Sequence, residues 1–245
     1  MKIWSYILWG ILVLVAAFFL IPGFFGLFVN PKKEYTKDSK LYRLILNLVS
    51  GIALWFMRVK IHVDGADKLP TEKRLLFVGN HRSNFDPIIT WFIFRKWNIA
   101  YVSKASNFKI PIFGRLIRRC CFMSIDRENA RKAIGTINHA AELLQKQEVS
   151  IGIYPEGTRA KDGVMLPFHN GVFRIAQKAN ADIAVLTISG TEKIHKNYPF
   201  RRSHVYLNVA EVIPSEVAKK MKTADIGERV RQTIEENLSK QAEVK

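Results

Sequence analysis

The chain has 245 residues, 48% of them hydrophobic, which suits one main domain with an appendage and is enough to build a core. Its 38 basic and 21 acidic residues give a formal net charge of +17, which points to nucleic acid, an anionic membrane or a phosphorylated substrate, with a merely solvated basic surface as the alternative. Its two cysteines, Cys120 and Cys121, are adjacent, which excludes an ordinary disulfide and favours a reducing compartment, and no CxxC or His/Cys spacing for zinc occurs.

The first predicted element is an apolar helix over residues 3–29, a stretch without any charge. About 20 apolar residues suffice to cross the core of a bilayer. A signal peptide is the alternative, but its apolar region usually has about 7–15 residues, and only Lys2 precedes this one. Pro22-Gly23 is expected to end or kink the helix.

A second helix is predicted over residues 41–58, with an uncharged run of about 13 residues from Leu44 to Phe56. That run is shorter than the roughly 17–25 residues that span a membrane. Its partner is therefore a leaflet interface, the first helix or the catalytic domain. Residues 1–58 are interpreted as a two-helix membrane anchor, and whether the first helix crosses the membrane or dips into one leaflet stays open.

The side chains around these helices support the anchor and orient it. Aromatic side chains suited to a membrane interface are Trp4, Tyr6, Trp9, Tyr42 and Trp55. Lysines crowd the connector between the helices, at Lys32, Lys33, Lys37 and Lys40. Positive charge marks the cytoplasmic side, so we expect a membrane-associated protein on the cytoplasmic face of the cell membrane.

Residues 59–245 are predicted to form a single α/β domain, with a central, largely buried β-sheet flanked by helices. Short apolar runs predict strands at residues 59–63, 75–79, 99–103, 121–125, 150–154, 183–188 and 204–210. Apolar residues recur at helical spacing between and after the strands, at Ala130, Ile134, Ile137, Ala141 and Leu144 and at Ile226, Val230, Ile234 and Leu238.

The first candidate for chemistry is the segment from Asn80 to Pro87, directly after a predicted strand. On a helix, His81 and Asp86 would lie about 140° apart around the axis, but Pro87 disfavours helical angles at Asp86 and suits the first position of a new helix, which predicts a strand-to-helix turn. In such a turn the carboxylate can bond one ring nitrogen and leave the other free to take a proton from a hydroxyl. The alternative, at even odds on spacing alone, is that Asp86 caps the helix and His81 is an ordinary loop histidine.

Three further polar segments follow predicted strands. Tyr154-Pro155-Glu156-Gly157-Thr158-Arg159 forms a tight turn in which glycine lets backbone N–H groups approach a ligand and Arg159 can bind phosphate with two hydrogen bonds. Ser124-Ile125-Asp126-Arg127 is the second, and Lys104 after the strand at 99–103 is the third. Ligands of α/β sheets bind beyond the carboxyl ends of strands, so one shared site is expected. For each cation alone, a surface salt bridge is the favoured alternative.

The order of four blocks, NHRSNFD, SIDR, YPEGTR and ADIAVLTISG, resembles that of the glycerolipid acyltransferases. The likeness spans about residues 59–210. Its most specific part is the H-x4-D motif followed by PEGTR about 75 residues later. SIDR followed by EGTR looks more like the branch that acylates 1-acylglycerol 3-phosphate than the branch that acylates glycerol 3-phosphate.

The resemblance implies a role for each matching residue. His81 is the expected general base and Asp86 its partner. Contacts with the phosphate and glycerol of the acceptor are expected from Arg127, Glu156, Gly157, Thr158 and Arg159. The implied reaction is transfer of an acyl chain from acyl-CoA or acyl carrier protein to the sn-2 hydroxyl of lysophosphatidic acid, which gives phosphatidic acid in phospholipid synthesis.

No cofactor or metal is expected, because His81 and Asp86 alone are a poor ligand set, and without a G-x-S-x-G motif a serine acyl-enzyme is not expected. The expected partners are a lysophospholipid, an acyl thioester, an anionic membrane surface and, as a further possibility, acyl carrier protein. Nucleic acid is not expected, because no recognition helix, RNP motif or zinc finger occurs. The alternatives are acylation of glycerol 3-phosphate or another lysophospholipid, and an inactive lipid-binding or tethering protein.

Overall fold

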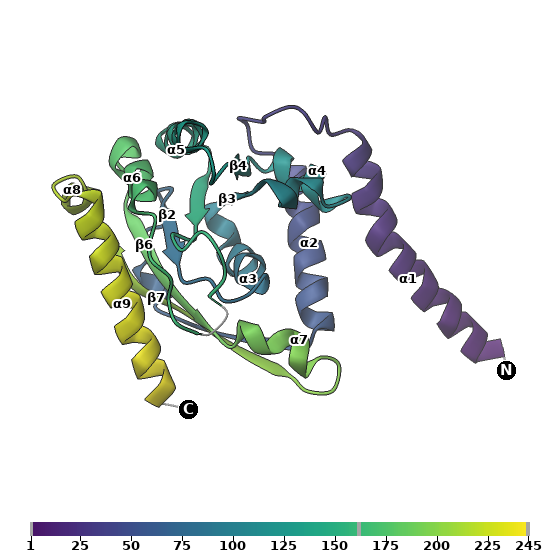
Figure 1. The fold of residues 1–245 in the computed structure, drawn as a ribbon. Coiled ribbons are helices and arrows are strands. Elements are labelled where there is room, and N and C mark those ends of the chain that lie inside the picture. Colours follow the sequence, from purple (N-terminus) through teal and green to yellow (C-terminus); the bar gives the residue numbers. More distant parts are fainter. Residues whose placement is uncertain (1, 161–162, 244–245) are drawn as a thin grey trace.

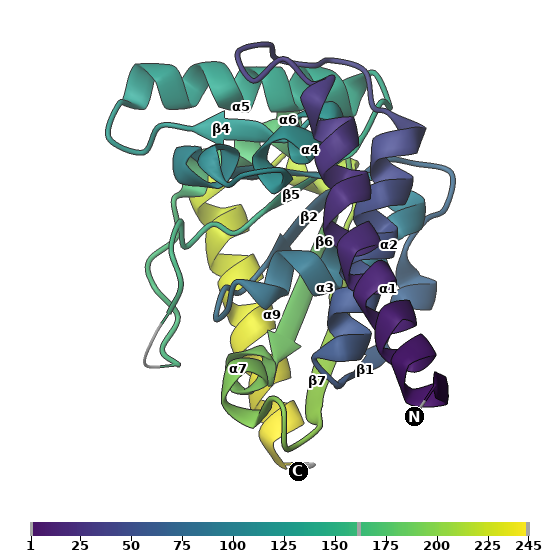
Figure 2. The ribbon, with the colours of Figure 1, turned by 90° about the vertical axis from the view of Figure 1, so that its right-hand side faces the viewer.

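The computed structural model describes residues 2–160 and 163–243, which fold into a central sheet with helices on both faces (Figures 1 and 2). The strands are β1 Val59–Asp64, β2 Leu76–Gly79, β3 Ile99–Lys104, β4 Met123–Ile125, β5 Ser150–Ile153, β6 Ile183–Ser189 and β7 Ser203–Ile213. The helices are α1 Lys2–Leu27, α2 Lys40–Phe56, α3 Phe85–Ile93, α4 Phe113–Arg119, α5 Ala130–Gln145, α6 Arg174–Ala179, α7 Ile194–Asn197, α8 Ser215–Ala218 and α9 Thr223–Glu243. All seven predicted strands and the predicted α/β architecture are confirmed.

The sheet has the strand order β1-β7-β6-β2-β5-β3-β4. The five strands from β6 to β4 are mutually parallel, whereas β7 runs antiparallel to β6 and parallel to β1. Every residue of β2, β5 and β6 is buried, as expected for strands covered on both faces. Along β7 buried residues alternate with more exposed ones, so one face of the β1–β7 edge meets solvent.

Two hydrophobic cores lie on opposite faces of the sheet. One core packs α5, α6 and α9 against it through residues such as Leu144, Ile175 and Val230. The other contains buried residues of α2, α3 and α4, among them Ile45, Ile89 and Leu116. The parallel strands β2, β5 and β6 therefore direct their carboxyl ends to one edge between two helical layers, which is where ligands bind in such sheets.

The first helix, α1, leaves this body and is almost entirely exposed from Trp4 to Leu27, and by length and composition it is long and apolar enough to cross a membrane. Of the two outcomes expected at Pro22-Gly23, an end of the helix is wrong, because α1 continues to Leu27, whereas a kink stays a prediction. Pro22 lies inside the helix, where a proline lacks one backbone N–H donor but does not by itself end the helix. Its last turns are held by hydrogen bonds from Tyr42 Oη to the Phe25 carbonyl and from Arg115 to the Gly26 carbonyl.

The second helix, α2, belongs to the body of the protein. Tyr42, Ile45, Leu46 and Leu54 are buried in the core beside α3 and α4. At its start, Arg43 makes a buried salt bridge with Asp38, with 2.7 Å between Nε and Oδ2, and stacks its guanidinium over Trp91. The catalytic domain is therefore one of the partners expected for this helix. The outer face of α2 carries exposed Leu44, Leu48 and Trp55. The boundary at residues 58 and 59 and the role as an anchor stay predictions.

Candidate active site

The segment from Asn80 to Asn84 connects β2 to α3 at the carboxyl edge of the sheet. Buried Asn80 fixes its start, because its side chain donates to the Ile188 carbonyl at 2.9 Å and accepts from the Ile188 N–H at 2.9 Å. This pair of bonds ties the segment to β6, where Gly79 lies against the backbone of Leu186. The catalytic candidates therefore start from a rigid strand end.

His81 and Asp86 meet as the spacing suggested. His81 Nδ1 lies 2.9 Å from Asp86 Oδ2, and Asp86 is fully buried. Because a carboxylate only accepts, Nδ1 carries the proton in this bond, and the neutral ring presents Nε2 as a base. No hydrogen-bond partner of Nε2 is present within residues 2–160 and 163–243. The arrangement leaves one nitrogen of His81 available to a hydroxyl.

The Asp86 carboxylate is held by three more donors. The backbone N–H groups of Arg82 and Ser83 both donate to Oδ2 at 2.7 Å, and Thr191 Oγ1 donates to Oδ1 at 2.6 Å. Asp86 itself lies in the first turn of α3, because the helix begins at Phe85, two residues before the predicted first position at Pro87, so the expectation of a non-helical Asp86 is wrong. Pro87 is tolerated there because the first N–H groups of a helix have no partner within the helix.

Tyr154 covers one face of the imidazole. Its ring stacks on His81 with 4.4 Å between centroids and an angle of 17° between planes. Thr90 Oγ1 hydrogen-bonds the hydroxyls of Tyr101 and Tyr154, and donates to the Asp86 carbonyl at 2.8 Å. Burial raises the pKa of the Tyr154 hydroxyl well above its ordinary value, so Tyr154 stays neutral and acts on His81 through packing.

Glu156 connects the two motifs. It is 3% exposed, and its Oε1 accepts from the His81 N–H at 2.8 Å while Oε2 accepts from the Leu166 N–H at 2.9 Å. Burial raises the pKa of this carboxyl, and the two N–H donors oppose that shift. A further bond runs from the Ala160 N–H to the His81 carbonyl at 2.9 Å, so the turn after β5 holds the backbone of His81 from two sides.

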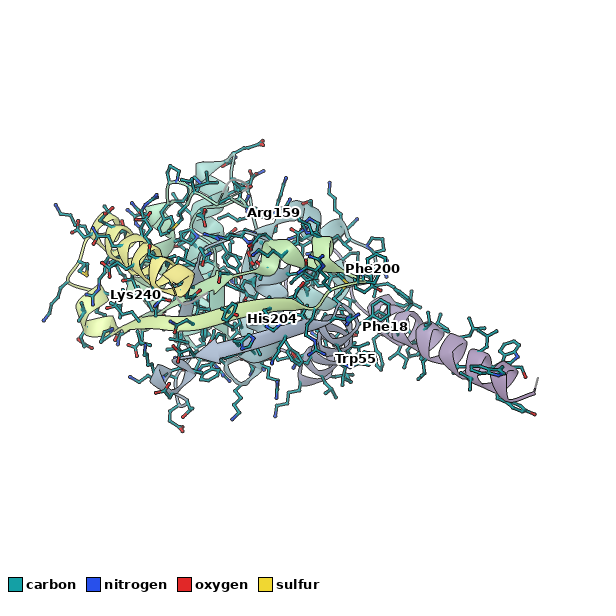
Figure 3. The ribbon with its side chains drawn as sticks, turned by 90° about the horizontal axis from the view of Figure 1, so that it is seen from below. Phe18, Trp55, Arg159, Phe200, His204 and Lys240 are labelled. Atoms are coloured by element: carbon teal, nitrogen blue, oxygen red, sulfur yellow. The ribbon has the colours of Figure 1, made fainter. Side chains whose placement is uncertain are left out.

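The turn that follows β5 also faces the candidate cations. Gly157 adopts φ 69°, a left-handed conformation that favours glycine, and a Cβ there would lie 3.1 Å from the His169 ring and 4.0 Å from Arg127 Nε. Partial desolvation lowers the pKa of the Arg127 guanidinium, which still remains a cation because its ordinary pKa is far above neutral. Thr158 and Arg159 are exposed at the tip. Figure 3 labels Arg159 in the view from below.

The predicted site residues thus separate into two groups. His81, Asp86 and Glu156 form one hydrogen-bonded cluster. Arg127, Gly157, Thr158 and Arg159 lie together in the adjoining loops, and Lys104 pairs with Ile125 at the ends of β3 and β4, two residues before Arg127. Their roles in binding stay predictions. Thr191 and Thr90 were not predicted as part of the cluster, and Tyr154 was placed in the predicted turn without a role of its own, although the rule of polar residues after strand ends also points to Thr191 after β6.

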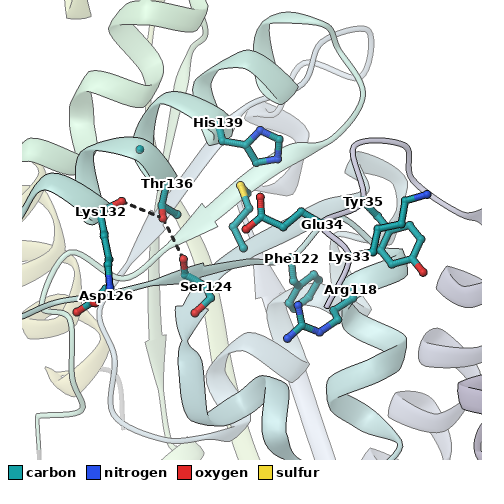
Figure 4. A pocket seen from close by; sticks show the side chains of 12 residues that line it. Lys33, Glu34, Tyr35, Arg118, Phe122, Ser124, Asp126, Lys132, Thr136 and His139 are labelled. Atoms are coloured by element: carbon teal, nitrogen blue, oxygen red, sulfur yellow. Dashed lines mark hydrogen bonds and ion pairs between the residues drawn. The ribbon is translucent and has the colours of Figure 1, made fainter. Parts of the chain in front are cut away.

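Separate from His81 is a cavity of about 400 Å³ between the connector before α2, β4 and α5 (Figure 4). Its walls carry Lys33, Arg118 and Lys132 but also Glu34 and Asp126, so two of the three positive charges are compensated. Among the described residues no group of three His, Cys, Asp or Glu side chains is arranged to hold a metal ion. The expectation that the reaction needs no cofactor stays a prediction.

Known proteins share these segments. The Acyltransferase family profile matches residues 60–190, slightly more than half of the chain. A 1-acyl-sn-glycerol-3-phosphate acyltransferase from Escherichia coli strain K12 is 34% identical over 140 residues, which cover 57% of this chain and 55% of that protein. A protein of the same name from Limnanthes douglasii is 26% identical over 175 residues, or 71% of this chain and 61% of the relative, so the chain spans less than two thirds of the length of these curated relatives.

A solved structure extends the likeness to the whole fold. The crystal structure of the 1-acyl-sn-glycerophosphate (LPA) acyltransferase PlsC from Thermotoga maritima superposes with a TM-score of 0.71. The alignment covers 96% of this chain and 94% of that one at 19% identity, which shows a common fold. Because the matched residues 60–190 contain the His81–Asp86 pair, Arg127 and the turn from Glu156 to Arg159, the chain belongs to the Acyltransferase family.

Proposed function

We propose that this protein transfers an acyl chain from an acyl thioester to the sn-2 hydroxyl of lysophosphatidic acid, producing phosphatidic acid for phospholipid synthesis. The observation that carries the proposal is the His81–Asp86 pair, fixed at 2.9 Å beside the turn that bears Arg159. Several relatives are named for this reaction, and the sequence motifs resemble those of the same branch. The acyl donor is acyl-CoA or acyl carrier protein, and no cofactor takes part.

In the proposed mechanism, His81 Nε2 takes the proton of the acceptor hydroxyl as its oxygen attacks the thioester carbonyl carbon. The tetrahedral intermediate then collapses with cleavage of the C–S bond, and the imidazolium returns the proton to the departing thiolate. Asp86 stabilises the imidazolium through the bond to Nδ1. General-base catalysis of this kind typically contributes about 10²–10⁴-fold to a rate.

Binding of the acceptor uses the cations around the second motif. Arg127 and Arg159 bind the phosphate, with Lys104 as a further contributor, while Gly157 and Thr158 leave room for phosphate and glycerol oxygens. Glu156 has both carboxylate oxygens engaged by backbone N–H groups, so we assign it to positioning of the His81 backbone. This refines the role in acceptor contact that the family motif implied for it.

A panel of substrates tests the reaction. Purified protein is offered lysophosphatidic acid, glycerol 3-phosphate and other lysophospholipids as acceptors, each with acyl-CoA and with acyl-loaded acyl carrier protein. We expect phosphatidic acid to form fastest from lysophosphatidic acid, with the strongly impaired His81→Ala variant as the control. Faster turnover of glycerol 3-phosphate or of another lysophospholipid would support the alternative acceptors, and near-normal turnover by folded His81→Ala would refute the mechanism.

We further propose that α1 and the outer face of α2 hold the protein on the cytoplasmic face of the cell membrane. Support comes from the exposed apolar surface of α1 and from the lysines of the connector. The acceptor then reaches His81 while its acyl tail stays in the bilayer. Attachment by apolar burial resists salt, whereas attachment by the +17 charge alone weakens as ions screen it.

Washing of membranes distinguishes the two modes of attachment. We expect the intact protein to resist high salt and to dissolve in detergent. Deletion of residues 2–22 keeps α2 and the contacts of Phe25 and Gly26, and this variant should be released by salt in a folded state. Release of the intact protein by salt alone would refute the apolar anchor.

A further inference from the structure

A second cavity, of about 490 Å³, lies where α2 ends and β1 begins. It is lined by Trp55, Phe56, Arg58, Val59, Lys60 and Arg202. Three of these side chains are cations, and among the described residues no carboxylate lines the cavity. In this respect it differs from the cavity beside α5, whose cations face Glu34 and Asp126. Uncompensated positive charge marks it as a site for an anion.

Backbone conformation fixes one of these cations. Arg58 adopts φ 54°, the left-handed conformation at the end of a helix where glycine is usual, and its carbonyl accepts from the Ser203 N–H at 3.2 Å. The conformation is unfavourable for a residue with a side chain, and such residues cluster at binding sites. Arg58 Nη1 also donates to the Pro199 carbonyl at 3.1 Å, which joins the cavity to the loop between α7 and β7.

That loop carries a large apolar side chain into solvent. Phe200 is 87% exposed, and the neighbouring Arg201 and Arg202 are exposed as well. The loop is held against α2 by the rings of Tyr198 and Phe56, whose centroids are 5.4 Å apart. In the view from below, Phe200 and Trp55 lie on the same side of the molecule as the emerging helix with Phe18 (Figure 3). Trp55 is 80% exposed.

We propose that this corner, made of Trp55, Phe56, Arg58, Lys60, Phe200 and Arg202, binds the headgroup of an anionic phospholipid in the bilayer. The three cations of the cavity contact the phosphate, while Trp55 and Phe200 enter the interfacial layer, where amphipathic and aromatic side chains accumulate. Clusters of basic residues next to apolar membrane-binding segments recognise anionic lipids. The lipid is distinct from the acceptor at His81, which follows β2, two strands away from β7.

The chemistry favours a lipid surface over a soluble anion. A soluble phosphate ligand gains nothing from the exposed rings of Trp55 and Phe200, whereas a membrane buries both rings and the cations together. The inference rests on the proposed attachment of the protein to a membrane. It places a third contact, at the β1–β7 edge of the sheet, beside the two helices.

Insertion of this corner into the membrane is measured with a fluorophore attached to the full-length protein, which is bound to lipid vesicles. Cys120 and Cys121 are buried, so Phe200→Cys accepts an environment-sensitive thiol label at one position. Leu20→Cys in α1 reports on the anchor. Ile134→Cys, at an exposed position of α5, serves as the label outside the membrane. Vesicles contain phosphatidylcholine, with phosphatidylglycerol titrated in, and a quencher on the lipid chains.

We expect quenching at position 200 to rise with the fraction of phosphatidylglycerol and to stay absent at position 134. Arg58→Ala, Lys60→Ala and Arg202→Ala should each raise the half-maximal phosphatidylglycerol fraction about fivefold, the equivalent of roughly 1 kcal/mol per basic residue at an anionic surface. The matched control removes three cations elsewhere, at exposed Lys219, Lys220 and Lys222, and should leave the titration unchanged.

Four outcomes would overturn the inference. They are quenching at 20 without quenching at 200, equal quenching at 200 in neutral vesicles, an equal response to the control substitutions, and loss of the contact when inorganic phosphate is added at matched ionic strength, which would indicate a site for free phosphate. No quenching at position 20 would refute the membrane anchor itself, so the two proposals fail in distinguishable ways.

Discussion

Two turns at the same edge of the sheet are built in opposite ways. The turn after β2 is anchored on a buried carboxylate, because Asp86 at the start of α3 accepts hydrogen bonds from His81, Arg82, Ser83 and Thr191. The turn after β5 buries Glu156 but leaves Thr158 and Arg159 in solvent. One turn is held by hydrogen bonds before any substrate arrives, and the other presents an exposed cation, Arg159.

The difference corresponds to the two tasks. A proton transfer depends on the position of one nitrogen atom to within a fraction of an ångström. His81 therefore benefits from the contacts that hold its backbone, its Nδ1 atom and one face of its ring. A phosphate carries its charge on several oxygens and accepts many approaches of a guanidinium. Glu156 belongs to both turns, because it lies in the second and holds the backbone of the first. Substitutions in the two turns should therefore affect different kinetic constants.

The largest effect is expected for His81→Ala and Asp86→Ala, each of which should lower kcat by roughly 10²–10⁴-fold because the pair acts as one base. Turnover at saturating acceptor measures this loss, and circular dichroism establishes that the variants fold. His195→Ala removes an exposed histidine of α7 and should keep full activity. A folded His81→Ala protein with near-normal kcat would show that His81 is not the base, and the comparison of the two turns would then have no functional meaning.

Arg159→Ala should raise the KM for the phosphate-bearing acceptor by roughly 10- to 150-fold, from a charged hydrogen-bonding contact of about 1.5–3 kcal/mol. The KM for the acyl donor and kcat should change less. Arg131→Ala, which removes an exposed arginine of α5, is the matched control. A rise confined to the donor KM would assign Arg159 to the other substrate.

Thr191→Val should lower kcat by about 2- to 12-fold, the equivalent of roughly 0.5–1.5 kcal/mol for one hydrogen bond, because Asp86 Oδ1 loses its donor. Thr191→Ser keeps the hydroxyl and should restore most of the rate. Loss of stability without a change in kcat of the folded fraction would make Thr191 structural rather than positioning.

The smallest effect is expected for Tyr154→Phe, which keeps the ring stacked on His81 and removes only the hydroxyl near Thr90. We expect kcat to change by less than about twofold, since this 3.3 Å contact is long for a hydrogen bond. Tyr154→Leu removes the stacked ring and serves as the comparison. A large loss for Tyr154→Phe would show that the hydroxyl itself takes part in the reaction.

Much of the fold could be predicted because its signals are local. The runs at 75–79, 150–154 and 183–188 are apolar without interruption, as fully buried parallel strands require, and β2, β5 and β6 lie there. The His81–Asp86 pair was predictable from spacing combined with Pro87, which disfavours a continuous helix. The ends of the strands were predicted less exactly, since β7 continues to Ile213, three residues beyond the predicted strand end at 210.

The remaining features depend on tertiary contacts. Thr191 reaches Asp86 only because β6 lies beside β2, and one threonine after a strand gives no sign of which loop it will meet. The pairing of the ring of Tyr154 with His81 likewise follows from the adjacency of β5 and β2. Short helices such as α4 and α6 were not predicted, because six or seven residues carry too little periodicity.

The order of the strands has a consequence for synthesis of the chain. β2 pairs with β5 and β6, so the strand that carries the histidine has no neighbour in the sheet when it leaves the ribosome. Asn80 and Ile188 are separated by 108 positions and Asp86 and Thr191 by 105 positions, and contacts between such distant segments close late in folding. A nascent chain that ends before β6 holds the base and its partner but lacks the Thr191 hydroxyl and the clamp on Asn80. The complete hydrogen-bonded cluster around Asp86 and Asn80 can therefore form only after β6 and Thr191 have been synthesised.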